Sequence, residues 1–158
     1  MTRNLDRRTF IGTAAVATTG VLAGCGGDGG GESTATASGD DVPSEVSEYL
    51  SETTNFDGSV ADETGSDSVS VDVGAEGNGG NFAYAPAAIS VDTGTTVTFV
   101  WTGEGQEHNV VHEDGDFESE QTAEDGFEFE YTFESAGNYL YYCTPHESLG
   151  MKGAVIVE

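Results

Sequence analysis

Basic residues are nearly absent from this sequence, which carries four Lys and Arg residues against 29 Asp and Glu residues. Three of the four lie close to the N-terminus, so Lys152 is the single basic residue after position 24. The chain from Cys25 onward contains one basic residue, Lys152, and all of the acidic residues except Asp6. Its formal charge is therefore about −27. Because the chain offers no basic patch that could displace counterions from phosphates, a role in binding nucleic acid is excluded.

The acidic excess repels itself and destabilises a compact chain in dilute buffer. In about 1 M salt the screening length falls to roughly 3 Å, which removes much of this repulsion, so we expect a halophilic source. Twelve acidic residues and no Lys or Arg lie between Glu104 and Glu134. This stretch is either an acidic docking face for a basic partner or part of a generally acidic halophilic surface, and both interpretations stay open.

Cysteine is scarce too, with Cys25 and Cys143 as the only two in the chain. In an exported protein such a pair most often forms a disulfide. A Cys with a His nearby can instead be a nucleophile with its base, or half of a zinc site. The residues around each cysteine favour two separate roles, which follow below.

Long apolar runs are missing as well: the uncharged stretch of residues 11–23 is short and rich in Gly, Thr and Ala, unlike a membrane span. Arg7-Arg8 precede it and resemble a twin-arginine export signal, which a receptor reads as an address. At its end Leu22-Ala23-Gly24-Cys25 resembles a lipobox, in which cleavage before the cysteine accompanies lipid attachment to its sulfur. We expect residues 1–24 to be a twin-arginine lipoprotein signal peptide and Cys25 to carry the lipid.

The segment after this signal divides into a linker and a helix. After Cys25, residues up to position 41 are Gly, Ser, Thr, Ala and Asp with one Glu and no apolar periodicity, which predicts a flexible linker over residues 25–41. Residues 43–50 begin with Pro and carry apolar residues at i, i+3 and i+4, the pattern of a short helix packed on a domain. A single domain is expected over residues 42–158, which suffice for one hydrophobic core.

From Ser68 onward apolar residues recur with period two, the signature of half-buried strands. The alternation runs through Val69, Val71 and Val73, then Val97, Phe99 and Trp101, then Phe127, Phe129, Tyr131 and Phe133. Further strands are expected at residues 82–84, 88–91, 109–112, 138–143 and 153–157. Seven or eight short strands predict an all-β protein, an antiparallel β-sandwich.

The residues with distinctive chemistry gather on one loop near the C-terminus. Cys143-x2-His146-x4-Met151 places a thiolate, an imidazole and a thioether together, and His108 supplies a second imidazole upstream. His, Cys, His and a weakly bound Met are the ligand set of a trigonal blue-copper electron-transfer site, which holds one Cu(I)/Cu(II) ion. A nucleophilic Cys gives no reason for Met151, and a structural zinc site rarely keeps a Met ligand, so copper is favoured.

This loop, with the strand pattern of residues 153–157 after it, resembles the plastocyanins. Together with residues 105–111 and the run Tyr141-Tyr142-Cys143-Thr144-Pro145-His146, it makes residues 42–158 similar to the halocyanins, small blue-copper proteins of haloarchaea. The resemblance implies a cupredoxin-like Greek-key β-sandwich with the four ligands at one end. It also implies that Asn109 offers its backbone N–H to the Cys143 sulfur and ties the two ligand loops together, and that His146 is the exposed ligand through which electrons pass.

The resulting hypothesis is an electron carrier, not an enzyme, that is lipid-anchored on the extracytoplasmic side of the cell membrane. It would shuttle one electron between membrane or extracytoplasmic redox proteins, its donor and acceptor, and we expect a monomer. Because the same ligands bind copper in either case, an extracytoplasmic copper storage or delivery protein is the alternative. His112, the remaining histidine, is expected at a strand end facing solvent and outside the ligand set.

Overall fold

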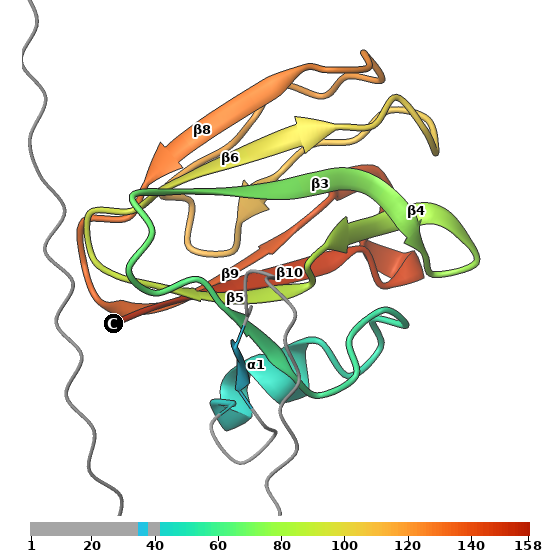
Figure 1. Cartoon of the computed structure of the whole chain (residues 1–158). Coiled ribbons are helices and arrows are strands. Elements are labelled where there is room, and N and C mark those ends of the chain that lie inside the picture. The colour runs from blue at the N-terminus through green and yellow to red at the C-terminus, as the bar shows by residue number, and fades with distance from the viewer. Residues whose placement is uncertain (1–34, 38–41) are drawn as a thin grey trace, which may run out of the picture. The chain divides into compact units, whose positions relative to one another are not determined.

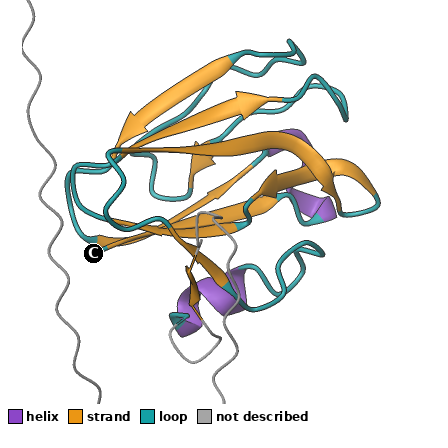
Figure 2. Ribbon diagram, in the orientation of Figure 1, coloured by secondary structure: helices purple, strands orange, loops and turns teal. Residues whose placement is uncertain are grey.

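The computed structural model describes residues 35–37 and 42–158 of the chain. These residues form two β-sheets packed face to face, with a short helix outside them (Figure 1; Figure 2). The predicted signal peptide, the lipid attachment site Cys25 and most of the predicted linker lie outside the described residues and stay predictions.

The two sheets contain ten strands among the described residues. The first sheet has the order β1 (Ala35–Ala37), β2 (Val60–Asp62), β5 (Ala88–Val91), β10 (Lys152–Val157), β9 (Gly137–Tyr142) and β7 (Val111–His112). The second sheet has the order β4 (Gly80–Ala85), β3 (Ser68–Gly77), β6 (Thr96–Trp101) and β8 (Glu128–Thr132).

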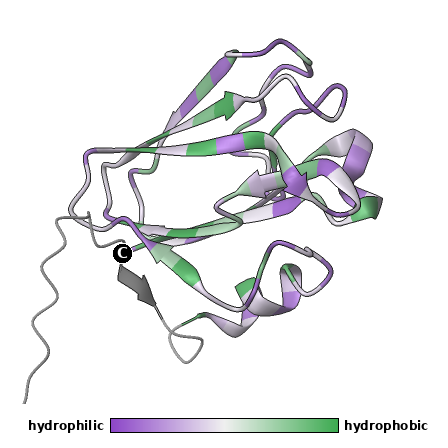
Figure 3. Ribbon diagram, turned by 45° about the vertical axis from the view of Figure 1, so that its right-hand side comes forward, coloured by the Kyte–Doolittle hydropathy of each residue, from purple (hydrophilic) through white to green (hydrophobic). Residues whose placement is uncertain are grey.

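The core lies between the sheets and is built from the alternating residues that the sequence singles out. In β6 every second residue is buried, namely Val97, Phe99 and Trp101, and β3 buries its valines in the same way. Successive side chains of a strand point to opposite faces, so apolar and polar residues alternate along β3 (Figure 3). Burying a side chain such as Phe99 contributes about 1.5–3 kcal/mol to the stability of the folded state. The two packed sheets confirm the predicted all-β sandwich.

The prediction of a purely antiparallel sandwich is wrong. Three strand pairs are parallel: β3 with β6, β5 with β10, and β2 with β5. Alternating hydrophobicity tells which face of a strand is buried, but it does not tell the direction of the neighbouring strand. The direction comes from Greek-key connections, here the path from β3 through β4 and β5 before the chain returns to β6 beside β3.

The predicted short helix is confirmed as α1 (Ser44–Tyr49). Its side chain Val46 and the following Leu50 are fully buried in a second apolar cluster with Val60, Ala88 and Ala154. Since Ile89 and Val155 face the main core, their neighbours Ala88 and Ala154 face the opposite side of the first sheet. The helix therefore covers the outer face of that sheet, on the side away from β3 and β6 (Figure 1).

No sequence pattern predicts β1 or β2. The strand β1 falls inside the expected linker of residues 25–41, yet Ala35 to Ala37 pair in antiparallel register with Asp62 to Val60. A three-residue strand is too short to show a period of two, so no alternation marks it in the sequence. The part of the linker at residues 35–37 is therefore a strand at the edge of the first sheet.

The prediction that His112 faces solvent is also wrong, although it does end a strand, β7. Its side chain is buried and stacks on the Phe117 ring, with centroids 4.9 Å apart and an interplanar angle of 13°. The Nδ1 atom lies 3.4 Å from the Asp116 carboxylate and accepts the Asp116 N–H at 3.2 Å. A tight turn after His112 folds Phe117 back over the ring, which period-two patterning does not report.

Within residues 35–37 and 42–158, no helix has the length and apolar character needed to cross a bilayer.

Candidate metal centre

Three of the predicted ligands meet at one end of the sandwich. The ligand atoms of His108, Cys143 and His146 all lie within 4.8 Å of one another, and all three residues are buried. The Cys143 Sγ atom is 3.7 Å from Nδ1 of His108 and 3.5 Å from Nδ1 of His146. The two Nδ1 atoms are 3.1 Å apart.

These separations fit a single metal ion. Nitrogen and sulfur ligands held about 2.0–2.3 Å from a common centre lie roughly 3.3–4.0 Å from one another, and the observed triangle is close to that size. Two imidazoles and one thiolate are also the trigonal donor set that copper takes in electron-transfer proteins. The residues present therefore fit a copper ion both by spacing and by chemistry.

The sandwich holds the ligand residues on separate elements. His108 lies between β6 and β7, where its N–H donates to Thr122 O at 2.9 Å and its carbonyl accepts the Thr122 N–H at 3.0 Å. The Trp101 indole N–H, at the end of β6, donates to the same His108 carbonyl at 3.1 Å. Cys143 follows β9 directly, and His146 lies on the short helix η1 (Thr144–Leu149) at the same end (Figure 2).

The backbone carbonyl of Glu104 determines which nitrogen of His108 faces the centre. His108 Nε2 lies 2.8 Å from Glu104 O, and because a carbonyl oxygen only accepts, Nε2 must carry the proton. Nδ1 then presents its lone pair to the other two ligand atoms, the arrangement that metal-binding histidines use. Burial lowers the pKa of His108 more than the Glu104 carbonyl raises it, so the ring is neutral and able to bind a metal.

Gly105, the residue after Glu104, leaves space for the contact between His108 Nε2 and the Glu104 carbonyl. Its φ of +76° lies in the left-handed region, and a Cβ added there would clash with the Asn81 backbone and approach His108 Nε2 to 2.9 Å. A glycine is therefore required where the loop turns past the imidazole.

Cys143 lies at the bottom of the site, fully buried. Burial raises the pKa of its thiol to about 11, while the backbone N–H groups of Asn109 and His146 act in the opposite direction by hydrogen bonding to the sulfur. Pro145 contributes no N–H, and the His146 N–H donates to the Cys143 carbonyl at 3.1 Å.

The side chain of Asn109 ties the two ligand loops together, as the resemblance implies. Its Oδ1 accepts the Thr144 N–H at 2.8 Å and its Nδ2 donates to Thr144 Oγ1 at 3.1 Å. Asn109 itself is held in the core by Tyr84, whose hydroxyl donates to the Asn109 carbonyl at 2.6 Å. The loop of His108 and the loop of Cys143 are therefore coupled by side-chain bonds before any metal is bound.

His146 is more covered than the resemblance implies. It exposes 7% of its surface, against 1% for His108 and none for Cys143 or Met151. The Phe82 ring packs over it with centroids 4.6 Å apart. Burial lowers the pKa of His146, so this imidazole is neutral too. It remains the candidate ligand nearest to solvent, on a helix whose Pro145 and Glu147 are exposed.

Met151 is fully buried in the same apolar cluster as Cys143. Its N–H donates to His146 O at 3.2 Å, and its carbonyl accepts the Cys143 N–H at 3.1 Å. The loop from Cys143 to Met151 is thereby closed on itself, with the Met151 backbone bonded to the backbones of Cys143 and His146.

Two polar residues outside the predicted site, Thr53 and Asn78, contact this loop. Both donate side-chain hydrogen bonds to the carbonyl of Gly150, the residue before Met151. The dipeptide Asn78-Gly79 is a recognised hairpin turn signal and could have marked one of them. No sequence pattern points to Thr53.

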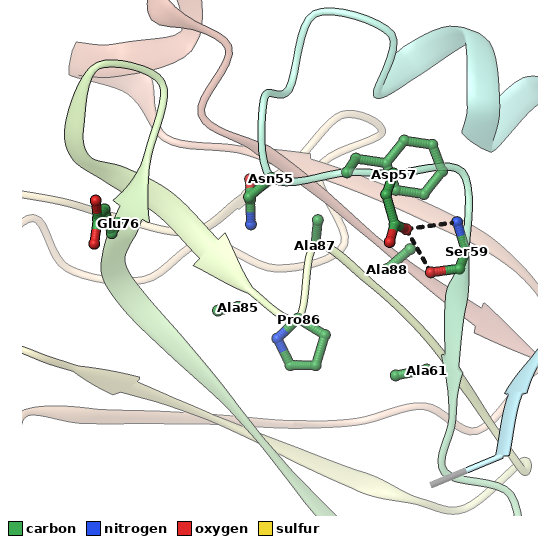
Figure 4. Close-up of a pocket in the computed structure, with 10 residues that line it drawn as sticks. Asn55, Asp57, Ser59, Ala61, Glu76, Ala85, Pro86, Ala87 and Ala88 are labelled. Atoms are coloured by element: carbon green, nitrogen blue, oxygen red, sulfur yellow. Dashed lines mark hydrogen bonds between the residues drawn. The ribbon is translucent and has the colours of Figure 1, made fainter.

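A separate cavity of about 350 Å³ lies between β2, β4 and the start of β5 (Figure 4). None of the four predicted ligands lines it. Its wall is lined by small apolar residues such as Pro86 and Ala87, together with Asn55, Asp57 and Glu76. Asp57 is engaged with the N–H and hydroxyl of Ser59.

Comparison with known proteins places this geometry among copper proteins. Residues 69–158 match the family described as copper binding proteins, plastocyanin/azurin family. The chain is 48% identical over 164 residues to a halocyanin of Natronomonas pharaonis, an alignment that covers 99% of each chain. It is 32% identical over 100 residues to a plastocyanin of Scenedesmus fuscus, which covers 57% of this chain and 99% of that one.

Among solved structures, the chain is similar to a mutant fern plastocyanin whose oxidized and reduced structures are known. The identity is 31%, the TM-score is 0.48, and the match covers 57% of this chain and 100% of that chain.

Proposed function

The chain belongs to the plastocyanin/azurin family of copper-binding proteins, and we propose that it is a membrane-tethered type 1 blue-copper electron carrier. In this proposal it shuttles one electron between redox partners at the outer face of the cell membrane. The observation that carries the proposal is the buried triangle of two imidazole nitrogens and one thiol sulfur, 3.1–3.7 Å on its sides.

We assign His108, Cys143, His146 and Met151 as the copper ligands, the last as the weak axial one. A copper ion bound there would cycle between Cu(I) and Cu(II), with soft sulfur favouring the first state and the imidazoles suiting the second. The protein's contribution is rigidity: the Glu104 carbonyl orients His108, and Asn109 couples the two loops. Because the ligands are held in advance, electron transfer need not wait for them to rearrange.

His146 is the route by which we expect electrons to enter and leave. It is the least buried of the four residues, and η1 presents it beside exposed side chains. Leu149 on the same helix is 47% exposed, and acidic Glu147 lies next to His146 in the sequence. A partner docking here would meet one large apolar side chain and a carboxylate, so it would depend less on apolar contact than on polar complementarity.

The proposal of a lipid tether is based on the sequence of the N-terminal segment, which lies outside the described residues. The twin-arginine motif, the lipobox at Cys25 and the linker after it support lipid anchoring on the extracytoplasmic side. The relative from Natronomonas pharaonis aligns over nearly the whole chain, so the N-terminal segment belongs to the shared sequence. The proposed partners are membrane or extracytoplasmic redox proteins, and the proposed carrier is a monomer without enzymatic activity.

The alternative, copper storage or delivery, is less well supported by the burial of the site. A delivery protein must hand its ion to an acceptor by exchanging ligands, and that exchange needs access to the ligand atoms. Here His108, Cys143 and Met151 expose at most 1% of their surface. A carrier should keep its copper through repeated oxidation and reduction, whereas a delivery protein should lose Cu(I) to a metal-free acceptor.

The test is to add Cu(II) to the purified protein and to record its visible absorption and EPR spectra. We expect an intense blue colour and a narrow copper hyperfine splitting, both of which require a short copper–thiolate bond. The Cys143→Ser variant should be colourless, while the matched control Cys25→Ser should stay blue. A colourless wild type that binds zinc stoichiometrically would refute the proposal.

A further inference from the structure

The carbonyl of Gly150 is the most heavily hydrogen-bonded acceptor around the site. Thr53 Oγ1 donates to it at 2.9 Å, Asn78 Nδ2 at 3.0 Å, and the Lys152 N–H at 2.9 Å. This carbonyl belongs to the peptide that carries the Met151 nitrogen. The bond from Lys152 spans two residues and makes Met151 the centre of a γ-turn, so the orientation of this peptide sets where the Met151 side chain begins.

The two side-chain donors come from parts of the chain that the ligand loop does not include. Thr53 lies in the segment after α1 and exposes only 3% of its surface. Asn78 lies in the β3–β4 hairpin with φ of +56°, a conformation that asparagine tolerates better than most residues. Thr53 also lies outside residues 69–158, the part of the chain that matches the copper-binding family.

Asn78 is also bound to Thr54, the residue that follows Thr53. The Thr54 N–H donates to Asn78 Oδ1 at 2.9 Å, and the Asn78 N–H donates to Thr54 Oγ1 at 2.6 Å. Asn78 Nδ2 further donates to the Phe82 carbonyl at 2.7 Å, next to the ring that covers His146. Leu50, fully buried just before this segment, anchors it to the first sheet.

The lack of a side chain at Gly150 allows Thr53 and Asn78 to approach its carbonyl. Its φ is +94°, and an added Cβ would lie 2.6 Å from Glu52 O and 3.1 Å from Asn78 Oδ1. Any side chain at this position would push residues 52–54 away from the loop. The absence of a side chain therefore permits the close approach that the two hydrogen bonds need.

We propose that Thr53 and Asn78 are positioning residues for the axial ligand: by clamping the Gly150 carbonyl they fix Met151 and so help to set the reduction potential. The inference rests on the proposed function, because it assumes that Met151 binds copper. Hydrogen bonds around a ligand tune a metal site, and a soft axial thioether favours Cu(I). Loosening Met151 should therefore lower the potential, by less than replacing it would.

The experiment compares Thr53→Val and Asn78→Gly with wild type in the purified full-length protein. Valine has nearly the shape of threonine but no donor, and glycine accepts the positive φ of residue 78. Thr53→Ser, which restores the hydroxyl, should restore wild-type behaviour. The matched control is Thr95→Val, because Thr95 is equally buried and its hydroxyl donates to Ser66 O at 2.9 Å, away from the ligand loops.

We expect Thr53→Val and Asn78→Gly to lower the potential measured by voltammetry and to alter the EPR hyperfine splitting, while Thr95→Val changes neither. In the metal-free protein, amide hydrogen exchange at Met151 and Lys152 should speed up several-fold in the first two variants only. Should Thr53→Val fail to fold, Asn78→Gly decides the outcome. A blue wild type with both variants unchanged in potential, spectrum and exchange would overturn this inference alone. A wild type without the blue band would overturn the proposed function and this inference with it.

Discussion

Asn109→Ala removes both side-chain bonds between the two ligand loops and leaves the backbone N–H that faces the Cys143 sulfur. The bonds to Thr144 measure 2.8 and 3.1 Å, and Asn109 is 5% exposed. At about 1 kcal/mol each, their loss should cost the metal-free protein about 2 kcal/mol of unfolding free energy. For a domain of this size that corresponds to a fall in Tm of roughly 6–12 °C.

The copper-loaded protein should lose more. Removing a group that orients metal ligands typically lowers metal affinity by about 10–100-fold, which is about 1.4–2.7 kcal/mol. At saturating copper this loss adds to the first, for a total of about 3–5 kcal/mol. Urea unfolding of the metal-free and Cu(II) forms, with a competition titration for copper, measures the two parts separately.

The control for this prediction is Asn138→Ala, which removes one exposed bond of 3.3 Å to Glu45 and should change stability by no more than about 0.5 kcal/mol. If Asn109→Ala lowers the stability of both forms equally and leaves the copper affinity unchanged, the coupling of the loops has no part in holding the metal. The reasoning about preformed ligands would then be refuted.

Three further predictions concern the axial ligand, the anchor and the charge. Met151→Gln should keep copper but lower the potential, because the axial residue tunes the site without making the copper–thiolate bond; voltammetry showing an unchanged or raised potential would contradict this. Cys25→Ala should release the exported protein from the membrane fraction, and replacing Arg7-Arg8 by Lys-Lys should block export; fractionation and immunoblotting test both, and full membrane retention of Cys25→Ala would argue against lipidation. The Tm should rise from dilute buffer to molar KCl, because salt screens a charge of about −27 more in the compact state than in the expanded one. A Tm independent of salt would return residues 104–134 to consideration as a partner-docking surface.

Most of what the sequence predicts correctly is carried by local patterns. The period of two in β3 and β6 follows from the alternation of faces along any strand, so Val71 and Phe99 could be placed in a core without knowing their neighbours. The helix α1 likewise follows from apolar spacing after a Pro. The spacing of Cys143, His146 and Met151 needs only one loop, and their chemistry is specific enough to indicate copper.

The errors concern contacts that the alternation of residues along one strand does not report. The pattern around His112 predicts a polar strand end, but Phe117 folds over its ring. The pattern around β5 predicts antiparallel neighbours, but the crossovers bring β2 and β10 alongside in parallel. The strands β1 and β2 pair with each other, but three residues are too few to show a strand pattern in the sequence.

The sequence by itself determined the candidate ligands, because a metal selects thiolate, imidazole and thioether by their chemistry, whatever the backbone does. Only the tertiary structure decided how these ligands are held. Thr53 reaches Gly150 across 97 positions of sequence, and Asn109 reaches Thr144 across 35. Such contacts form because folding closes large loops at a cost that grows only slowly with their length. The sequence therefore predicts the donors of the site, and the fold supplies their geometry.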